Sequence, residues 1–423
     1  MSHPLPSSPG PVTAEVLVPG SKSETNRAFV IAALADGPCT VHGALASRDS
    51  DLMIAALRSM GVTVDGDVAS GLVITPAPSL RGSTAGIDCG LAGTVMRFVP
   101  PLALLAEGPT RFFGDPHASN RPMAGLLDAL RQLGADVDSD RLPVTVTPGR
   151  TVGHVVRVDS SATSQYISGL LLVAARLPRG LRIEQVGATV PSRPHIGMTV
   201  HMLREHGVRV DEVDDNTWQV LPGPIEAHDM TVEPDLTNAS VFLAAAAATG
   251  GSVTVPGWPA VNQQAGGLFL DIARRFGATT ERDGDRVTLH GPDRLQGIDV
   301  DLHAASELTP VVATLGALAQ GTTRIRGVGH IRGHETDRLA ALVTEFTRVG
   351  ISARETDDGL VVEGATSPAD LAPVEFETYA DHRMVHSAAI LALRVPGLSV
   401  TDLRCVAKTM PDFERDWRAA VGH

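Results

Sequence analysis

Lysine occurs only twice in this 423-residue chain, and both copies lie in polar segments that could hold an anion. Lys22 lies in PGSKSETNR at residues 19–27, and Lys408 lies in AKTMPD at residues 407–412. The other 33 of the 35 basic residues are arginines. A lysine ammonium is a compact charge that can give up its proton, whereas an arginine guanidinium effectively cannot. The placement indicates anion binding or proton transfer at both lysines; a coding bias toward arginine with two chance survivors is the alternative.

Arginines recur in similar settings, immediately before or at the start of expected helices. They are Arg27, Arg97 in LAGTVMR, Arg121 in NRPM, Arg338 in GHETDR and Arg383 in DHRM. A helix start carries free N–H groups and the positive end of the helix dipole, so it binds anions and disfavours cations. Cations gathered at that end are explained if multiply charged anions lie between them and the helix starts. Some of these positions also have a plain structural interpretation, with Asp49, Asp235 and Thr237 as helix caps and Arg97 as a brace.

The elements that must position these residues form an internal repeat. Each unit has a short apolar helix that ends near a glycine, then a strand-like segment, an amphipathic helix and further strand-like residues. The apolar helices are expected near residues 29, 98, 167, 241, 311 and 384, and the amphipathic ones at 52–60, 123–133, 196–206, 268–276, 339–349 and 413–420. Marker glycines follow the apolar helices at spacings of 71, 72, 71, 70 and 76 residues: Gly37, Gly108, Gly180, Gly251, Gly321 and Gly397. Another set should end the amphipathic helices in the left-handed conformation: Gly61, Gly134, Gly207, Gly277 and Gly350.

Six copies of the repeat account for the whole chain, but the sixth ends at its amphipathic helix. Residues 13–18 have the alternating pattern of the missing strand, so we expect the repeat to close circularly. A closed chain of six units in two domains needs two crossovers, for which Pro19-Gly20 and residues 233–235 are the candidate hinges. The expected domains are therefore residues 1–20 with 235–423, and residues 21–234, in an α/β fold.

Composition restricts the class of protein. A chain of 423 residues exceeds what one hydrophobic core usually supports. Three cysteines without paired spacing indicate neither a disulfide framework nor a zinc site. A net charge of −13 with 4% aromatic residues argues against nucleic acid as a partner. The sequence has no 18-residue apolar run, and residues 1–11 carry Ser and Pro without a signal pattern, which predicts a short disordered tail on a cytoplasmic protein with no membrane partner.

Taken together, these motifs resemble those of the enolpyruvyl transferases, and in detail those of the EPSP synthase family, the 3-phosphoshikimate 1-carboxyvinyltransferases. The resemblance extends from about residue 12 to the C-terminus and includes the Ser164-Gln165 pair. It implies an inside-out α/β barrel in each of two domains, built from three βαβαββ units apiece, with the active site in the cleft between the domains. That fold agrees with the six repeats read from the sequence.

The resemblance also implies a reaction. The enolpyruvyl group of phosphoenolpyruvate is transferred to the 5-hydroxyl of shikimate 3-phosphate with release of phosphate, a step of aromatic amino acid biosynthesis through the shikimate pathway. It implies a monomer that needs no metal, nucleotide or other cofactor. The residues implied to bind phosphoenolpyruvate are Lys22, Gly93, Arg121, Gln165, Arg338, Arg383 and Lys408. Those implied to bind shikimate 3-phosphate are Lys22, Ser23, Arg27, Thr163, Ser164, Gln165, Ser192, Glu307 and His334. The candidates for proton transfer are Lys22, Glu307, which would face the 5-hydroxyl, and Glu335.

The sequence departs from the family pattern at a few positions. Glu307 stands where aspartate is common, His334 where lysine is common, and Thr163 where serine is usual. Phe98 replaces a proline typical of one subgroup, which leaves the response to the inhibitor glyphosate open. None of these changes removes a chemical group that the reaction needs.

Two alternatives compete with this function. The first is UDP-N-acetylglucosamine 1-carboxyvinyltransferase, whose usual catalytic cysteine lies in a loop that corresponds to residues 114–121, where this sequence has no cysteine. The second is a catalytically inactive anion-binding scaffold. The presence of Glu307, Glu335 and both lysines argues against that scaffold.

Overall fold

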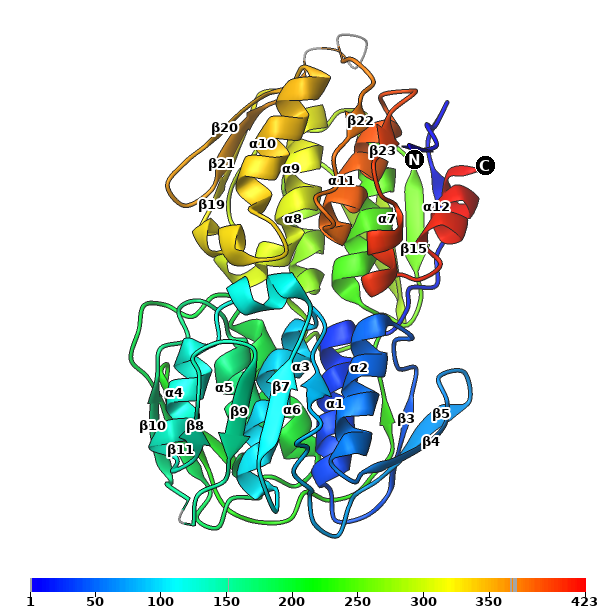
Figure 1. Cartoon of the computed structure of the whole chain (residues 1–423). Helices are drawn as coiled ribbons and strands as arrows, with labels where there is room; N and C mark the ends of the chain where they lie inside the picture. Colours follow the sequence, from blue (N-terminus) through cyan, green and yellow to red (C-terminus); the bar gives the residue numbers. More distant parts are fainter. Residues whose placement is uncertain (1, 151, 366, 368–370) are drawn as a thin grey trace. The chain divides into compact units, whose positions relative to one another are not determined.

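The computed structural model describes residues 2–150, 152–365, 367 and 371–423, and the chain divides into two compact units (Figure 1). Unit 1 comprises Met1–Pro19 and Glu233–His423, and unit 2 comprises Gly20–Val232. Each unit has its own hydrophobic core. The fold is mixed α/β. The described strands form six separate sheets, and none of these sheets is a closed barrel.

Five of the six sheets repeat one four-stranded order, which confirms the repeat read from the sequence. In each of them the first strand runs parallel to the second, and the remaining two strands are antiparallel to their neighbours. In unit 2 the sheets are β14 (Met230–Thr231), β3 (Cys39–His42), β5 (Gly71–Thr75), β4 (Thr63–Asp67); β6 (Ile87–Asp88), β7 (Thr110–Phe113), β9 (Val144–Thr147), β8 (Asp136–Val137); and β10 (Val155–Val158), β11 (Leu181–Gln185), β13 (Thr217–Val220), β12 (Val210–Asp214). In unit 1 they are β2 (Thr13–Glu15), β15 (Ser252–Val255), β17 (Arg286–His290), β16 (Thr279–Asp283); and β18 (Asp299–Asp301), β19 (Thr322–Arg326), β21 (Leu360–Glu363), β20 (Ser352–Glu355).

The chain passes from one unit to the other after β2 and again after β14, and each of these strands pairs within its own unit. β2 precedes the first helix of unit 2 but pairs in parallel with β15 of unit 1. β14 precedes the first long helix of unit 1 but pairs in parallel with β3 of unit 2. The sequence suggested that residues 13–18 replace the missing strand of the sixth repeat, and that prediction is wrong. These residues supply the parallel edge of the fourth.

The sixth sheet is completed instead by the extreme N-terminus. β1 (His3–Pro4) pairs antiparallel with β23 (Ser399–Val400), which runs parallel to β22 (Glu375–Phe376). The Leu5 amide donates to the Leu398 carbonyl at 3.0 Å. The expectation of a disordered tail over residues 1–11 is wrong for residues 3–5, because the free edge of β23 offers backbone groups that need partners. Met1 lies outside the described residues.

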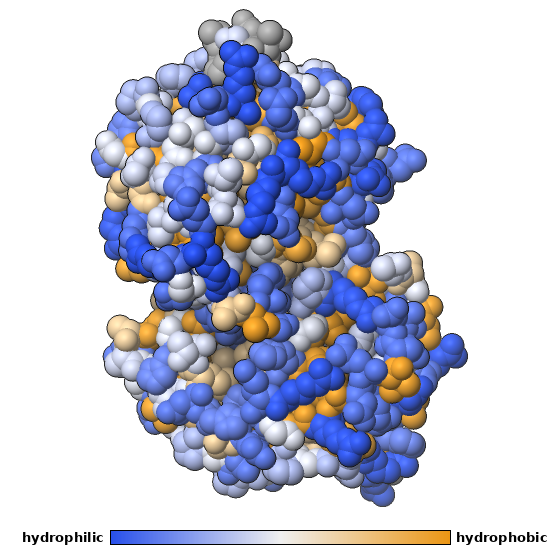
Figure 2. Space-filling view, turned by 180° about the vertical axis from the view of Figure 1, so that it is seen from behind, coloured by the Kyte–Doolittle hydropathy of each residue, from blue (hydrophilic) through white to orange (hydrophobic). Residues whose placement is uncertain are grey.

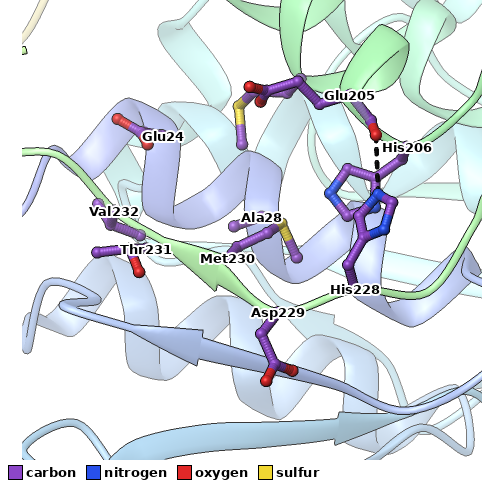
Figure 3. Close-up of a pocket in the computed structure, with 10 residues that line it drawn as sticks. Glu24, Ala28, Glu205, His206, His228, Asp229, Met230, Thr231 and Val232 are labelled. Atoms are coloured by element: carbon purple, nitrogen blue, oxygen red, sulfur yellow. Dashed lines mark hydrogen bonds between the residues drawn. The ribbon is translucent and has the colours of Figure 1, made fainter. Parts of the chain in front are cut away.

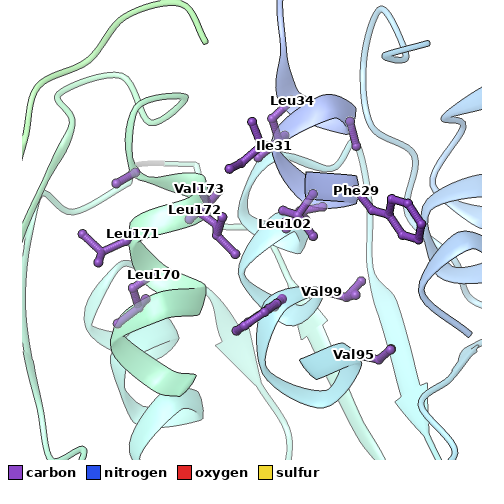
Figure 4. Close-up of a cluster of buried hydrophobic side chains, with 14 of the residues drawn as sticks. Phe29, Ile31, Leu34, Val95, Val99, Leu102, Leu170, Leu171, Leu172 and Val173 are labelled. Carbon is purple, nitrogen blue, oxygen red and sulfur yellow. The ribbon is translucent and has the colours of Figure 1, made fainter. Parts of the chain in front are cut away.

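Helices lie in two sets within each unit. The apolar set packs together at the centre of its unit: α1 (Lys22–Leu34), α3 (Gly93–Phe98) and α5 (Gln165–Ala174) in unit 2, and α7 (Leu236–Thr249), α9 (Thr309–Leu318) and α11 (His382–Ala392) in unit 1. Figure 4 shows side chains of α1, α3 and α5 meeting in the unit 2 core. The amphipathic set is α2 (Arg48–Ser59), α4 (Ala124–Gln132), α6 (Pro194–Glu205), α8 (Phe269–Arg275), α10 (Arg338–Val349) and α12 (Phe413–Val421).

The second apolar helix differs from its expected form. The sequence placed it from about residue 98, but α3 ends there and the chain continues as a 3-10 segment over Pro100–Leu105. Pro100 and Pro101 have no backbone N–H to continue an α-helix. Other 3-10 segments are Pro116–Asn120, Ala265–Leu268, His303–Leu308, Gly329–Gly333 and Arg404–Lys408.

The glycines expected to end the amphipathic helices take the left-handed conformation, which confirms that prediction. Their φ angles are +97°, +98°, +72°, +106° and +101° at Gly61, Gly134, Gly207, Gly277 and Gly350. Hydrophilic residues cover most of the face drawn in Figure 2. Among the residues that the structure describes, no helix has both the length and the apolar character needed to cross a bilayer.

Candidate functional site

In unit 2, three predicted site residues are the first residues of the three central helices. α1 begins at Lys22, α3 at Gly93 and α5 at Gln165. The N-cap of α1 is Ser21, whose hydroxyl accepts from the Glu24 amide at 3.4 Å. The repeat thus brings residues about 70 positions apart to equivalent places, where the free N–H groups of helix starts favour anions.

Gly93, Arg121 and Gln165 lie together, and we call them the Gly93 cluster. A Cβ atom on Gly93 would lie 3.1 Å from Arg121 Nη2 and 3.2 Å from the Gln165 side-chain oxygen. Arg121 Nη1 donates to the Leu91 carbonyl at 2.9 Å, which fixes the guanidinium above the start of α3. Arg97 also braces this region, because its Nη2 donates to the Pro122 carbonyl at 2.6 Å. The bracing role considered for Arg97 is therefore what the contacts support.

Lys22 has a carboxylate neighbour that the sequence did not assign to it. Lys22 Nζ lies 3.9 Å from Asp49 Oδ2, and the Asp49 side chain is only 5% exposed. The sequence suggested Asp49 as a helix cap, but Ser47 is the N-cap of α2 and accepts from the Ser50 amide at 3.3 Å. Asp49 lies in the first turn of α2. Because its carboxylate is close to Lys22 Nζ, its negative charge partly balances the charge of Lys22.

Arg27 is inside unit 2, and most of its donors are already used. Nε donates to Thr199 Oγ1 at 2.7 Å and Nη1 to the Ser23 carbonyl at 2.7 Å. Nη2 donates to Ser168 Oγ and to the His195 carbonyl, both at 3.1 Å. Burial lowers the pKa of Arg27 to about 9. One N–H, on Nη1, remains without an acceptor within the described residues, so Arg27 can make at most one direct contact to a ligand.

The remaining predicted residues of unit 2 are tied to these same groups. Thr163 Oγ1 accepts from the Gln165 amide at 3.2 Å, and Ser164 is the buried residue just before α5. Ser192 is buried with a φ of +49°, and its carbonyl accepts from the His195 amide at 3.1 Å. Since the His195 carbonyl binds Arg27, the Ser192 turn and the Ser23 carbonyl both converge on one guanidinium.

In unit 1, a chain of buried ion pairs joins several predicted residues; we call it the Arg338 network. Lys408 Nζ lies 2.5 Å from Glu335 Oε1, and Arg338 Nη2 lies 2.6 Å from Glu335 Oε2. Arg338 also donates through Nε to Asp381 Oδ2 at 2.7 Å. Burial alone would lower the pKa of Arg338, but Asp381 and Glu335 outweigh it and raise that pKa.

His334 belongs to the same network and is uncharged in this arrangement. Its Nδ1 lies 3.0 Å from Arg338 Nη1. A guanidinium can only donate, so Nδ1 must accept and the ring proton must be on Nε2. His334 therefore differs from the lysine that is common at this position, because it presents a neutral N–H donor.

Glu307 lies on the 3-10 segment His303–Leu308 that precedes α9. Its carboxylate acts electrostatically on Arg338, Arg383 and His330. Burial lowers the pKa of His330 to about 4, so this neighbouring imidazole is neutral at physiological pH. The structure thus brings Glu307 into the electrostatic range of the Arg338 network.

Arg383 is a buried cation with open donors. The residue is 5% exposed, and among the described residues Nε and Nη1 have no hydrogen-bond partner. Burial lowers the pKa of Arg383, and Asp235 opposes that shift. A buried guanidinium without acceptors is costly unless an anion supplies them.

One group of possible metal ligands occurs among the described residues. Ligand atoms of Glu335, Asp381 and His382 lie within 4.8 Å of one another. Both carboxylates already accept from cations, because Glu335 binds Lys408 and Arg338, and Asp381 binds Arg338. A divalent cation would have to displace those ion pairs, so the group is best described as part of the Arg338 network.

A pocket in unit 2 does not suit phosphorylated acids (Figure 3). It has a volume of about 290 Å³ and is lined from α1, α6 and residues 228–232. The lining includes the carboxylates of Glu24, Glu205 and Asp229 but neither lysine nor arginine. Such a lining would repel phosphate and carboxylate groups.

Two acidic residues of these clusters were not predicted as site residues. Asp381 pairs with Arg338, and its Oδ1 accepts from the Arg383 amide at 2.8 Å, although its place in the DHRM motif does not by itself predict that role. Asp49 lies beside Lys22, although its place in the sequence favours a helix cap. The signal available in each case was an acidic residue at a helix start of the repeat, which by itself does not identify a partner.

Comparisons with known proteins identify the family and the fold. The family model described as EPSP synthase (3-phosphoshikimate 1-carboxyvinyltransferase) matches residues 6–417. A solved structure of EPSP synthase from Acinetobacter baumannii is 25% identical, with a TM-score of 0.82 over 99% of this chain and 97% of that chain. A second structure of EPSP synthase from the same organism is 24% identical, with a TM-score of 0.81 over 99% of this chain and 98% of that chain, and supports the same fold. Since the family model covers nearly the whole sequence, the chain belongs to the EPSP synthase family.

Proposed function

We propose that the Gly93 cluster and the Arg338 network carry out the family's reaction on one pair of substrates. That reaction is the transfer of the enolpyruvyl group from phosphoenolpyruvate to the 5-hydroxyl of shikimate 3-phosphate, which gives 5-enolpyruvylshikimate 3-phosphate and phosphate. The observation that carries the proposal is Arg383, whose buried guanidinium has open donors beside Arg338. An anion bound there would supply the acceptors that the described residues do not.

Phosphoenolpyruvate is the ligand that we assign to the cations. Its phosphate and carboxylate need several donors, and arginine can bind either group through two parallel hydrogen bonds. We assign Arg121 and Gln165 of the Gly93 cluster, together with Lys22, from unit 2, and Arg338, Arg383 and Lys408 from unit 1. Gly93 leaves space for the ligand, because a Cβ there would press on Arg121 and Gln165.

Shikimate 3-phosphate is assigned to the polar residues around Arg27. The hydroxyls of Ser23, Thr163, Ser164 and Ser192 are suitable donors to a phosphate, and Lys22 and Gln165 contact both substrates in this assignment. Arg27 contributes its one open N–H and otherwise holds the Ser23 carbonyl and the Ser192 turn in place. From unit 1, His334 donates its Nε2–H, and Glu307 faces the 5-hydroxyl.

Proton transfer requires one acceptor and one donor. Glu307 accepts the proton of the 5-hydroxyl as that oxygen bonds to C2 of phosphoenolpyruvate, while C3 takes up a proton to become a methyl group. Glu335 or Lys22 supplies that proton. Loss of a proton from the methyl group and departure of phosphate from C2 then restore the double bond. Both Glu335 oxygens accept from cations here, so its use as an acid requires that the substrate anions draw Lys408 or Arg338 away.

The assignment draws on residues of both units. Lys22, Arg121 and Gln165 belong to unit 2, and Glu307, Arg338, Arg383 and Lys408 belong to unit 1. We propose that these units are the two domains of the family fold, each an inside-out α/β barrel of three repeats, and that neither is sufficient for catalysis. Arg121→Ala and Arg383→Ala should each raise the phosphoenolpyruvate KM. An unchanged KM in either variant would exclude the corresponding unit from that ligand.

A phosphate-release assay with alternative acceptors tests the function itself. With phosphoenolpyruvate present, shikimate 3-phosphate should support turnover and UDP-N-acetylglucosamine should not. Turnover with the nucleotide sugar alone would favour the related transferase, and turnover with neither would favour an inactive anion-binding scaffold. Glu307→Gln serves as the matched control, since it keeps the size of the side chain but removes the base.

We also propose that the enzyme is a cytoplasmic monomer. All three cysteines are unpaired in the structure, as expected of a protein in a reducing compartment. Sedimentation equilibrium tests the oligomeric state, and a mass of about twice 44.2 kDa would contradict it.

A further inference from the structure

The turn that precedes α11 has an unusual backbone. Tyr379 and Ala380 have φ angles of +53° and +54°, and the Asp381 amide donates to the Thr378 carbonyl at 2.8 Å. A turn with positive φ at both central residues strongly favours Asn and Gly, which Tyr and Ala are not. Side chains with a Cβ persist in this conformation only when the surroundings impose it.

A buried carboxylate on α10 imposes it. The Glu345 side chain is 1% exposed; its Oε1 accepts from the Tyr379 hydroxyl at 2.9 Å and its Oε2 from the Glu377 amide at 3.0 Å. Glu377 in turn accepts from the Tyr379 amide at 3.1 Å and from Thr401 Oγ1 at 2.9 Å. Burial and the bond to Glu345 raise the pKa of Tyr379 to about 12, so its hydroxyl remains a donor.

The turn leads directly into the Arg338 network. Asp381 is its last residue, and its carboxylate binds both Arg338 and the Arg383 amide. Arg338 is the first residue of α10, the helix that carries Glu345 two turns later. One helix therefore holds the turn at both ends, through Arg338 at Asp381 and through Glu345 at Tyr379.

We infer that Tyr379 is a positioning residue for phosphoenolpyruvate binding: its hydroxyl, bound to Glu345, holds the strained turn that places the Asp381 carboxylate against the Arg338 guanidinium and the Arg383 backbone amide. This inference rests on the proposed assignment of those two arginines to phosphoenolpyruvate. Without the hydroxyl, the turn can relax toward negative φ. Asp381 then moves, the Arg338 guanidinium loses the carboxylate that holds it, and the Arg383 amide at the start of α11 loses its acceptor.

Tyr379→Phe in the full chain is the direct test. The variant keeps the ring and removes one hydrogen bond to a charged group. We expect the phosphoenolpyruvate KM to rise about tenfold, which corresponds to about 1.4 kcal/mol, while the shikimate 3-phosphate KM and kcat stay within about twofold. Glu345→Gln should likewise raise the phosphoenolpyruvate KM and leave the shikimate 3-phosphate KM and kcat nearly unchanged. The glutamine amide nitrogen cannot accept from the Glu377 amide, so one of the bonds that hold the turn is lost.

Rescue separates positioning from general stability. Glycine takes a positive φ without strain, so adding Ala380→Gly to Tyr379→Phe should return the phosphoenolpyruvate KM to within about threefold of the wild type. Thr249→Val is the stability control, since it removes a buried hydrogen bond to the Val12 amide (2.9 Å) at the far end of α7. It should lower the melting temperature without changing either KM.

Three results would overturn the inference. They are an unchanged phosphoenolpyruvate KM in Tyr379→Phe, an equal rise in both substrate KM values, and a double variant that regains thermal stability but not the KM. The assignment of the arginines is checked separately with Arg383→Ala. If Arg383→Ala leaves the phosphoenolpyruvate KM unchanged, it is the site assignment that fails.

Discussion

Replacing Asp381 with asparagine tests whether the Arg338 network depends on this one buried charge. The Asp381 side chain is 0% exposed and that of Arg338 is 2% exposed. The carboxylate accepts from Arg338 Nε at 2.7 Å and Nη2 at 3.2 Å, and from the Arg383 amide at 2.8 Å. Asparagine keeps the size and one oxygen, so it can still cap α11, but it removes the charge.

The expected loss of unfolding free energy comes from the Arg338 charge, which stays buried after the Asp381 charge is removed. Removing one partner of a buried ion pair costs about 3–5 kcal/mol, because the other charge stays buried without compensation. Among the described residues, Glu335 would then be the one ion-pair partner of Arg338, and Lys408 shares it, while Arg383 would add repulsion. For a unit of this size about 1 kcal/mol corresponds to about 2–4 °C, so the melting temperature should fall by roughly 6–20 °C.

Urea unfolding followed by tryptophan fluorescence provides the assay. Trp258 and Trp417 report on unit 1, and Trp218 reports on unit 2. Asp299→Asn is the matched control, since Asp299 and Arg326 form a 2.8 Å pair in the same unit with side chains 56% and 48% exposed. That exposed pair should contribute less than about 1 kcal/mol. Equal losses of unfolding free energy in the two variants would refute the reasoning.

Four further outcomes are expected. Lys22→Arg keeps the charge but cannot release a proton, so kcat should fall at least about a hundredfold; near-wild-type turnover would leave arginine bias as the better account of the two lysines. Lys408→Arg should raise the phosphoenolpyruvate KM more than it lowers kcat, and steady-state kinetics would show the reverse if Lys408 transfers the proton. Gly93→Ala places a Cβ 3.1 Å from Arg121 Nη2, so glyphosate inhibition should weaken more than substrate binding, and unchanged inhibition with retained activity would contradict the pocket assignment. Burial lowers the pKa of His386 well below 6.5, so the folded protein keeps it neutral while the unfolded chain gains a proton; stability should fall by up to about 1.4 kcal/mol per pH unit below pH 6.5, and His386→Leu should flatten urea midpoints measured against pH.

The ion pairs of the Arg338 network join residues that are separated by very different distances along the sequence. Glu335 and Arg338 are three residues apart at the start of α10, whereas Lys408 is 73 residues from Glu335 and Asp381 is 43 residues from Arg338. The short-range pair could be suspected from the GHETDR motif. The long-range partners could not, because any acidic residue at a helix start satisfies the same local pattern.

The sequence by itself determined the repeat, the residue types of the site and the family. Apolar helices, left-handed glycines such as Gly61 and cations at helix starts are local features, fixed by hydrophobic periodicity and backbone conformation. Only the tertiary structure decided that β2 pairs with β15, β14 with β3, and β1 with β23. Strand pairing joins backbone groups that every sequence carries, so its partners are set by which edges the packed helices leave open. The same holds for Asp381 and Arg383, whose roles depend on burial and on charges contributed by distant parts of the chain.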